Sequence, residues 1–493
     1  MSSENFNSAT SVPVGSSIPK VQTGIRGLDD ILMGGLPQGR TTIINGTAGT
    51  GKTVMAMEFL YRGALAGEPG LFISFEERAG DIRINAAGMG IDIASLEEEG
   101  KFRVIHAELP PDAVNSGEFD TSGLLAMIEG HAGLIGAKRI VLDAIDVLMS
   151  IFKDPGRERE EISILHNRMR DLGMTTILTV KAGPEGRMIY PFLDFMADCV
   201  LFLDQRISGQ VRTRRLNVLK YRGSDFLSNE HPYVFSPNGI VLMPVSSLAL
   251  EKLSFHERVS SGHPKIDEIL GGGYFVGSSI LLAGPSGAGK TSLASIFAHA
   301  ACNKGEKVLY VDFEVAREAL VGAMRSIGLD LKPALEADSR LRIHTTMPES
   351  MGIEEHLLRI IDEMTLFSPH HLVVDAISAC RRMGSERAAF DFVVRLMTEC
   401  KSRGITCFYT NQVSNDQDPT YLSGLDLSSL VDTLITLEYF FEGQSLSRRL
   451  MVIKSRGSYH SVDFHQMNFT DHGLELKPIA DKTRRISGSE GRA

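Results

Sequence analysis

The sequence predicts an α/β protein made of two tandem domains, each a mostly parallel sheet flanked by helices. Three observations predict this fold. A glycine-rich loop lies between a short apolar strand and an apolar helix, the loop occurs twice, and strands alternate with helices around both copies. Strands that are apolar on both faces, such as the run before Glu76, are typical of a buried parallel sheet.

The first loop follows the β-branched strand at 41–44 and reads GTAGTGKT. Glycines allow successive backbone N–H groups to face a polyphosphate, and the following helix adds the partial positive charge of its N-terminus. A lysine at the end of such a loop reaches the β- and γ-phosphates, and the next hydroxyl binds Mg²⁺. We therefore expect ATP to bind Gly46, Thr47, Ala48, Gly49, Thr50, Gly51, Lys52 and Thr53. For a single copy, an ordinary glycine turn is the alternative.

The second copy, GPSGAGKT, makes the glycine-turn alternative weaker. The step along the chain from Lys52 to Lys290 equals the step from Gly24 to Gly262 and the step from Asp29 to Asp267. A constant offset indicates one nucleotide-binding domain that is present twice. The equivalent ATP-binding residues are Gly284, Pro285, Ser286, Gly287, Ala288, Gly289, Lys290 and Thr291.

Length and composition set the domain organisation. The 493 residues exceed what one core usually supports, and 43% hydrophobic with 23% charged residues is ordinary for a globular protein. We expect a disordered polar arm at 1–17, a first domain at 18–245, a linker at 246–257, a second domain at 258–480 and a C-terminal loop or tail at 481–493.

Charge and cysteine usage exclude several classes of protein. A net charge of −10 argues against constitutive nucleic-acid binding. No apolar run reaches the ~18–20 residues that a membrane span needs, and the N-terminus lacks a signal-peptide pattern, so we expect a cytoplasmic protein without a membrane partner. The five cysteines form no C-x-x-C pair and are expected to be buried free thiols in a reducing compartment.

Acidic residues follow the strands where a nucleotide would bind. In an open α/β sheet ligands bind at the carboxyl ends of the strands, so Asp143 and Asp375, each at the end of an apolar run, are expected to hold Mg²⁺. The alternative for each is a cap of the following helix. Glu76 and Glu77 are candidate bases for water; in the second domain only Glu314 has this place, because residue 315 is valine.

A K-x-R pair occurs late in each domain. Lys220 and Arg222 in the first domain, and Lys454 and Arg456 in the second, have the spacing that places both side chains on one face of a strand. A solvated basic face is the usual explanation of one such pair. Its recurrence in both halves favours a cation that contacts a phosphate, either in the same chain or in a neighbouring subunit.

Taken together, the tandem P-loop cores, the FEE segment, LDAID and VVDAIS, the K-x-R-G-S motifs and the ending TRRISGS resemble the KaiC family over about residues 18–488. That family comprises double-domain RecA-like ATPases of the bacterial circadian clock. The resemblance implies two RecA-like P-loop NTPase domains, with ATP and Mg²⁺ bound between the subunits of a homohexamer. It also implies a slow ATPase in the first domain and an autokinase in the second.

The resemblance further assigns roles to individual residues. Ser428 and Ser429 match the phosphorylated pair, although by themselves they indicate a helix N-cap or turn. Glu314 would be the kinase base, Arg382 a phosphate or phosphoserine contact, and the K-x-R pair of the second domain would reach the neighbour's ATP. The residues expected to hold Mg²⁺ are Thr53, Thr291, Asp143, Asp375 and Glu314.

Three features depart from the family pattern: Ser-Ser in place of Ser-Thr, Val315 in place of a second glutamate, and an end soon after Ser489. Because the tail that binds KaiA in the family is short here, we expect no binding of KaiA. The resemblance as a whole implies a switch that acts on a KaiB-like or other signalling partner in clock-like or stress signalling. The alternatives are a RecA- or RadA-like DNA motor, which the acidic composition disfavours, and a nucleotide-dependent scaffold with little turnover.

Overall fold

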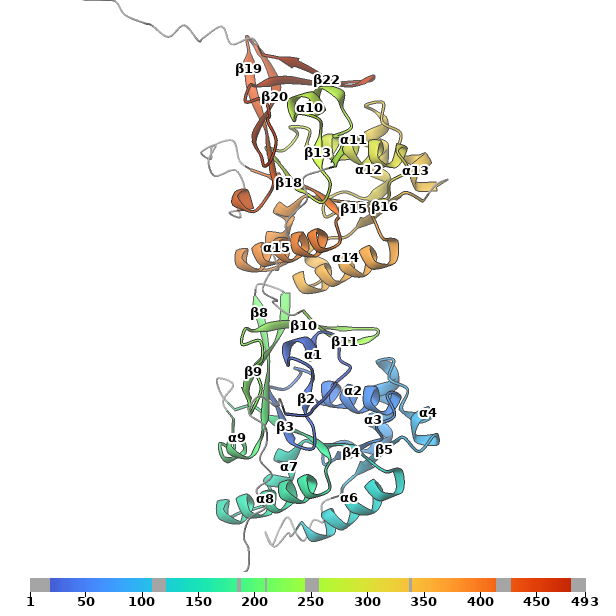
Figure 1. Cartoon of the computed structure of the whole chain (residues 1–493), viewed down its shortest axis with the longest axis vertical. Coiled ribbons are helices and arrows are strands. Elements are labelled where there is room, and N and C mark those ends of the chain that lie inside the picture. The colour runs from blue at the N-terminus through green and yellow to red at the C-terminus, as the bar shows by residue number, and fades with distance from the viewer. Residues whose placement is uncertain are drawn as a thin grey trace, which may run out of the picture. The chain divides into compact units, whose positions relative to one another are not determined.

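The computed structural model describes residues 18–108, 121–183, 188–208, 211–243, 257–336, 339–413 and 427–479. The chain forms two compact units, the first of residues 1–207 and 212–247 and the second of residues 208–211 and 248–493, and each is described by itself (Figure 1). The predicted arm, nearly all of the predicted linker and the predicted C-terminal tail lie outside the described residues.

The first unit contains a nine-stranded sheet in the order β11-β10-β9-β8-β3-β7-β6-β4-β5. The six strands from β8 to β5 in this order run parallel, whereas β10 is antiparallel to both of its neighbours. The strands are β3 Thr41–Gly46, β4 Gly70–Ser74, β5 Phe102–His106, β6 Arg139–Asp143, β7 Thr175–Lys181, β8 Cys199–Ser208, β9 Val211–Tyr221, β10 His231–Ser236 and β11 Gly239–Leu242, with β1 Lys20–Val21 and β2 Leu36–Pro37 in a small separate sheet.

Helices cover both faces of this sheet because successive strand residues point to opposite sides. One core packs α2, α3 and α4 against Ile44 and Phe72, and the other packs α6, α7 and α8 against Ile43 and Leu71. The described helices are α1 Leu28–Ile31, α2 Lys52–Leu65, α3 Ala79–Gly88, α4 Ile93–Glu98, α6 Ser122–Ile135, α7 Ile145–Met149, α8 Pro155–Asp171 and α9 Phe192–Met196.

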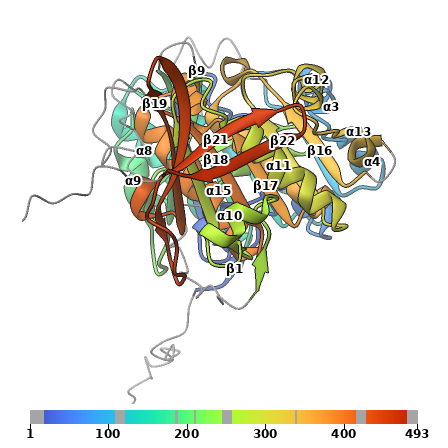
Figure 2. The same ribbon diagram turned by 90° about the horizontal axis from the view of Figure 1, so that it is seen from above.

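The second unit repeats this plan in the order β16-β15-β17-β18-β14-β19-β20-β21-β22, ending in antiparallel strands. Figure 2 shows the last two, β21 and β22, side by side. Its strands are β12 Arg258–Val259, β13 Tyr274–Phe275, β14 Ser279–Gly284, β15 Val308–Asp312, β16 Leu341–Thr345, β17 His371–Asp375, β18 Thr406–Gln412, β19 Thr433–Glu442, β20 Ser445–Ser455, β21 His465–Thr470 and β22 Gly473–Pro478. Its helices are α10 Pro264–Ile269, α11 Lys290–Asn303, α12 Arg317–Arg325, α13 Lys332–Glu336, α14 Ile353–Phe367 and α15 Glu386–Ser402, with 3₁₀ turns η2 Pro348–Ser350, η3 Ile377–Met383 and η4 Leu427–Ser429.

These two sheets confirm the predicted α/β class and the tandem arrangement. The offset between the two phosphate loops also relates β3 to β14 and β4 to β15, but the offset is shorter between β6 and β17 and between β8 and β19. The connections therefore differ in length between the halves while the strands keep their order, as expected because surface loops tolerate insertions. Within the described part of the chain, no helix combines the length and apolarity needed to cross a membrane.

Candidate functional site

The first phosphate loop connects the carboxyl end of β3 to the N-terminus of α2, as the sequence predicts. Lys52 Nζ donates hydrogen bonds to the carbonyl oxygens of Gly46 at 2.9 Å and Thr47 at 3.1 Å. Gly51 has φ of +91°, and a Cβ there would lie 2.4 Å from Phe235 Cζ, so only glycine fits. Burial lowers the pKa of Lys52, while the nearby carboxylate of Asp143 opposes this shift.

Asp143 lies at the carboxyl end of β6 and faces the same loop. Thr53 Oγ1 donates to its Oδ2 at 3.0 Å, and Thr179 Oγ1, from β7, donates to its Oδ1. Burial raises the pKa of Asp143, and the two hydroxyl donors counteract this effect. The N-cap residue of α7 is Ala144, so the helix-cap alternative for Asp143 is wrong.

The second loop has the same arrangement, except that a different residue donates to the second oxygen of its aspartate. Lys290 Nζ donates to the carbonyl oxygens of Gly284 and Pro285, both at 2.8 Å, and Thr291 follows it on α11. Asp375 ends β17, and its Oδ1 accepts a hydrogen bond from Thr410. Its Oδ2 accepts from Tyr310 at 3.0 Å, whereas the equivalent oxygen in the first domain accepts from the loop threonine.

The sequence interpretation missed the residues that hold these aspartates. Thr179 is the fifth residue of β7, and Thr410 is the fifth residue of the equivalent strand β18. Repetition of a buried polar residue in both halves was the signal that could have identified them. Tyr310 occupies the position of Phe72, so only a comparison of the two halves distinguishes its hydroxyl from an ordinary core aromatic.

The interpretation also missed side chains that bind the loop backbone. In the first domain the Tyr233 hydroxyl donates to the Thr50 carbonyl at 2.6 Å. In the second, Arg448 Nε donates to the Gly287 carbonyl and the Tyr439 hydroxyl to the Ser286 carbonyl, both at 3.1 Å. These donors come from strands late in each domain, so their proximity to the loop depends on the fold.

Glu76 and Glu77 follow β4 in a turn, because the strand ends at Ser74 and not at the glutamates. The Ser74 hydroxyl accepts the Glu77 N–H at 2.9 Å, and Asn85 Nδ2 donates to the Glu77 carboxylate at 3.1 Å. Both glutamates are exposed. A cavity of about 510 Å³ lies between the start of α2 and α3, lined by Thr53, Val54, Met57, Glu77, Asn85 and Met89 among others.

Glu314 occupies the equivalent turn after β15. Asp312 Oδ1 accepts the N–H groups of Glu314 at 2.8 Å and Val315 at 2.7 Å. Burial raises the pKa of Asp312 to about 6. Arg382, predicted to contact a phosphate, lies 3.7 Å from the Glu314 carboxylate and 3.5 Å from that of Glu349. The structure thus brings Arg382 to the predicted kinase base.

The K-x-R pairs contact the backbone of their own chain. Lys454 Nζ donates to the carbonyl oxygens of Ser428 at 2.9 Å and Val431 at 2.7 Å, and Arg456 Nη2 donates to that of Ser429 at 2.6 Å. Ser429 is exposed and Ser428 half-buried, and both lie in η4. This agrees with the turn that the serine pair indicates by itself.

The first domain repeats these contacts without hydroxyl side chains. Lys220 donates to the carbonyl of Asp194, and Arg222 Nη2 to that of Phe195 at 2.8 Å. Asp194 and Phe195 are the counterparts of the serine pair, because the offset between them and the serines is the one that relates the two K-x-R pairs. The first domain therefore has equivalent backbone contacts, with Asp194 and Phe195 in place of the two serines.

Strand register places the serine pair far from the phosphate loop of its own domain. Thr433, the first residue of β19, pairs with Ile280 near the start of β14, and the Asp432 N–H donates to the Ser279 carbonyl. The loop begins at Gly284, the other end of the six-residue strand β14. At about 3.3 Å per residue, the strand separates the two groups by roughly 16 Å.

Comparison with known proteins decides the family. A model of the KaiC ATPase domain matches the chain twice, at residues 21–247 and 259–481. The chain belongs to the KaiC family. The circadian clock oscillator protein KaiC of Parathermosynechococcus lividus is 36% identical over 96% of this chain and 88% of its own length. The circadian clock protein KaiC2 of Synechocystis sp. is 37% identical over 93% and 82%, and KaiC of Synechococcus elongatus 34% over 100% and 95%.

Membership of this ATPase family implies nucleotide binding, and the residues present fit Mg²⁺-ATP. The Thr53 hydroxyl and the Asp143 carboxylate, 3.0 Å apart, are oxygen ligands of the kind that Mg²⁺ prefers. Among the described residues, no group of three or more His, Cys, Asp or Glu side chains could hold a metal ion. Because Mg²⁺ is usually held by one or two protein oxygen ligands together with substrate phosphates, phosphate oxygens of ATP would complete the coordination. The metal would neutralise charge that develops on them.

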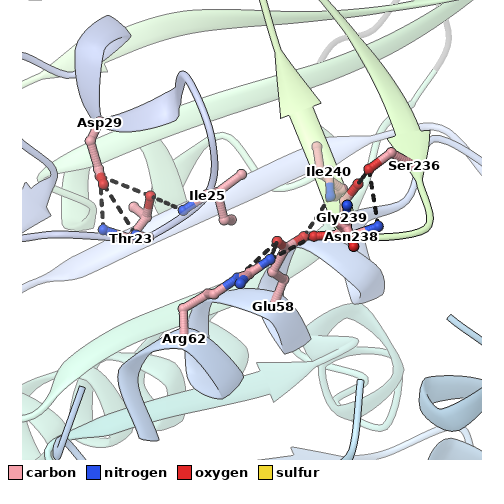
Figure 3. Close-up of polar contacts among 10 residues, drawn as sticks. Thr23, Ile25, Asp29, Glu58, Arg62, Ser236, Asn238, Gly239 and Ile240 are labelled. Carbon is pink, nitrogen blue, oxygen red and sulfur yellow. Dashed lines mark hydrogen bonds and ion pairs between the residues drawn. The ribbon is translucent and has the colours of Figure 1, made fainter. Parts of the chain in front are cut away.

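A half-buried ion pair connects α2 to the β10–β11 hairpin (Figure 3). Glu58 of α2 is 1% exposed; its Oε1 accepts from Arg62 at 3.0 Å, and its Oε2 accepts the Ile240 N–H at 2.7 Å. Arg62 also donates to the Asn238 carbonyl at 2.6 Å. These contacts fix the β10–β11 hairpin. Tyr233, on β10 of the same hairpin, is the residue whose hydroxyl donates to the loop carbonyl of Thr50.

The repeated aspartate of the sequence, Asp29, has a structural role in the same region. It accepts the N–H and hydroxyl of Thr23, both at 2.8 Å (Figure 3), and Asp267 likewise accepts the Ser261 N–H at 2.7 Å. All five cysteines are free and buried, as predicted.

Proposed function

We propose that this KaiC-family chain is a homohexameric ATPase whose second domain transfers phosphate from ATP to Ser428 and Ser429 of a neighbouring copy. One observation carries the proposal: the serine pair and the phosphate loop lie at opposite ends of β14. Phosphoryl transfer requires the reacting atoms to approach to about 3–3.5 Å. A serine at the far end of the strand does not reach the ATP of its own domain, so the proposal places the reacting ATP on a neighbouring copy.

The K-x-R pairs support the same arrangement. Lys454 and Arg456 lie at the serine end of the sheet, so a phosphate that they contact also belongs to a neighbour. Lys220 and Arg222 have the equivalent place in the first domain. We assign all four as cations for the adjacent nucleotide, in addition to their contacts with backbone carbonyls.

The remaining site residues have separate roles in this proposal. Lys52 and Lys290 bind the phosphates, and Asp143 and Asp375 hold the Mg²⁺. Glu76 and Glu77 orient the water for hydrolysis in the first domain. Glu314 accepts the serine proton in the second domain, with Arg382 beside it. Phosphorylation and nucleotide state would then switch a KaiB-like or other signalling partner.

Mixing two inactive variants tests transfer between chains. Lys290→Ala lacks the second phosphate site but retains the serines, and Ser428→Ala/Ser429→Ala lacks the serines but retains the site. Neither variant alone should incorporate phosphate from γ-labelled ATP. After the subunits are mixed and reassembled, label should appear on the Lys290→Ala chain. Label on the wild type but never on the mixture would contradict transfer between chains.

Native mass spectrometry with and without Mg²⁺-ATP tests the assembly. A hexamer in nucleotide supports the proposal, and a monomer at saturating nucleotide refutes it. Phosphate release by the wild type, Lys52→Ala and Lys290→Ala separates the two domains. Hydrolysis that persists in Lys290→Ala and falls in Lys52→Ala assigns turnover to the first domain. Negligible release by all three proteins would favour the scaffold alternative.

A further inference from the structure

The turn that carries Glu314 is built differently from its counterpart in the first domain. Asp312 is the last residue of β15, and Ser74 is the last residue of the equivalent strand β4. Ser74 accepts one N–H, that of Glu77, at 2.9 Å. Asp312 accepts two, from Glu314 and Val315, at 2.8 and 2.7 Å through the single oxygen Oδ1.

The carboxylate of Asp312 is held in an unfavourable environment. Its side chain is 1% exposed, and Oδ2 has no hydrogen-bond partner among the residues that the structure describes. Desolvation of a carboxylate oxygen without a partner costs free energy that a serine hydroxyl at this position would avoid. A carboxylate also forms shorter and stronger hydrogen bonds to backbone N–H groups than a hydroxyl does. An aspartate at position 312 therefore restrains the backbone of this turn more strongly than a serine would.

The second domain depends more than the first domain on a rigid backbone in this turn. The first domain presents two adjacent glutamates, Glu76 and Glu77, but the second has Val315 where Glu77 would be. Glu314 is 45% exposed and forms a long ion pair with Arg382 at 3.7 Å, so its side chain has only a weak restraint of its own. The backbone of the turn must then direct the carboxylate.

We propose that Asp312 is a positioning residue for Glu314. This rests on the proposed phosphoryl transfer: the serine oxygen bonds to the γ-phosphorus, the bond to the β-γ bridging oxygen breaks, ADP leaves with that electron pair, and the serine proton passes to Glu314. Asp312 touches none of these atoms. It fixes the N–H groups of Glu314 and Val315, and thereby the direction in which the Glu314 carboxylate points.

Phosphate on Ser428 and Ser429, measured in the otherwise wild-type chain, reports the activity of the second domain. Asp312→Ala removes both hydrogen bonds and should lower kcat for serine phosphorylation about 10- to 100-fold, as expected for a misplaced base. The KM for ATP should change less than about 3-fold, because the phosphate loop is untouched. Asp312→Asn keeps an oxygen that can accept both N–H groups and should restore most of the rate, with Asp312→Ser between the two.

A double-mutant cycle separates positioning from a general loss of structure. In a Glu314→Gln chain, adding Asp312→Ala should change the residual rate by less than about 2-fold, because no base remains to be positioned. A drop as large as in the parent chain overturns the inference. Ser74→Ala in a Lys290→Ala background is the matched control, and it should affect first-domain hydrolysis less than Asp312→Ala affects phosphorylation.

Hydrogen exchange tests the same inference without any activity. Peptides that contain the amides of Glu314 and Val315 should exchange faster in Asp312→Ala and at the parent rate in Asp312→Asn. Unchanged exchange in Asp312→Ala overturns the inference even if the wild type is active. If exchange is faster in Asp312→Ala but the wild type never phosphorylates itself, Asp312 holds the backbone of the turn as inferred. The proposed kinase activity, and with it the role of Glu314 as a base, would then be rejected.

Discussion

Replacing Glu58 by alanine should destabilise the first domain by about 3 kcal/mol. The substitution leaves the buried Ile240 N–H without an acceptor, which costs about 1–3 kcal/mol, and removes the partner of Arg62. Breaking a fully buried ion pair costs about 3–5 kcal/mol, but Arg62 is 35% exposed and can recover water, so the lower end of that range applies.

The second domain supplies the control for this experiment. The repeat places Ile296 and Ala300 at the positions equivalent to Glu58 and Arg62, and Ile296 is buried. Glu58→Ile/Arg62→Ala copies that apolar arrangement. Replacing a buried ion pair by apolar side chains is often neutral or stabilising. We therefore expect the double variant to be more stable than Glu58→Ala by about 1–2 kcal/mol, even though it also leaves the Ile240 N–H unpaired.

Native-state hydrogen exchange against urea measures the result, because peptides from α2 and β10 report the first domain separately from the second. The free energy of unfolding in these peptides should fall by about 3 kcal/mol in Glu58→Ala, while peptides from α11 stay unchanged. A fall below about 1 kcal/mol would refute the reasoning. A double variant as unstable as Glu58→Ala would show that the apolar arrangement of the second domain does not suit the first.

Three further outcomes are expected. Burial raises the pKa of Glu58, so in this pH range the folded domain binds more protons than the unfolded chain. The stability of the first domain should therefore fall as pH rises from about 4.5 to the raised pKa. Urea unfolding at a series of pH values should show this slope in the wild type, and the slope should be lost in Glu58→Gln. Tyr310→Phe removes the hydroxyl that donates to Asp375 and copies Phe72 of the first domain. It should raise the Mg²⁺ concentration for half-maximal serine phosphorylation a few-fold, and an unchanged Mg²⁺ titration would argue against this role. Tyr233→Phe leaves the Thr50 carbonyl without its donor and should lower first-domain stability by about 1 kcal/mol, measured by the same hydrogen-exchange assay, with unchanged values counting against the contact.

Residue order alone predicted much of the fold and the central part of each site. The phosphate loops could be placed because a β-branched strand, a glycine-rich loop and an apolar helix are local signals that follow one another directly in the chain. Asp143 and Asp375 could be placed next to the loops because the carboxyl ends of parallel strands share one edge of a sheet. The repeat made these local signals specific.

The tertiary structure decided every contact between residues far apart in the chain. Tyr233 reaches Thr50 across 183 positions, and Thr179 reaches Asp143 across 36, because β10 and β7 fold back beside the loop. Spacing in the sequence carries no information on such contacts, since the length of the connections varies freely while strand order and register fix the distances. For the same reason, only the register of β14 and β19 shows that the serine pair lies at the opposite end of the sheet from its own phosphate loop.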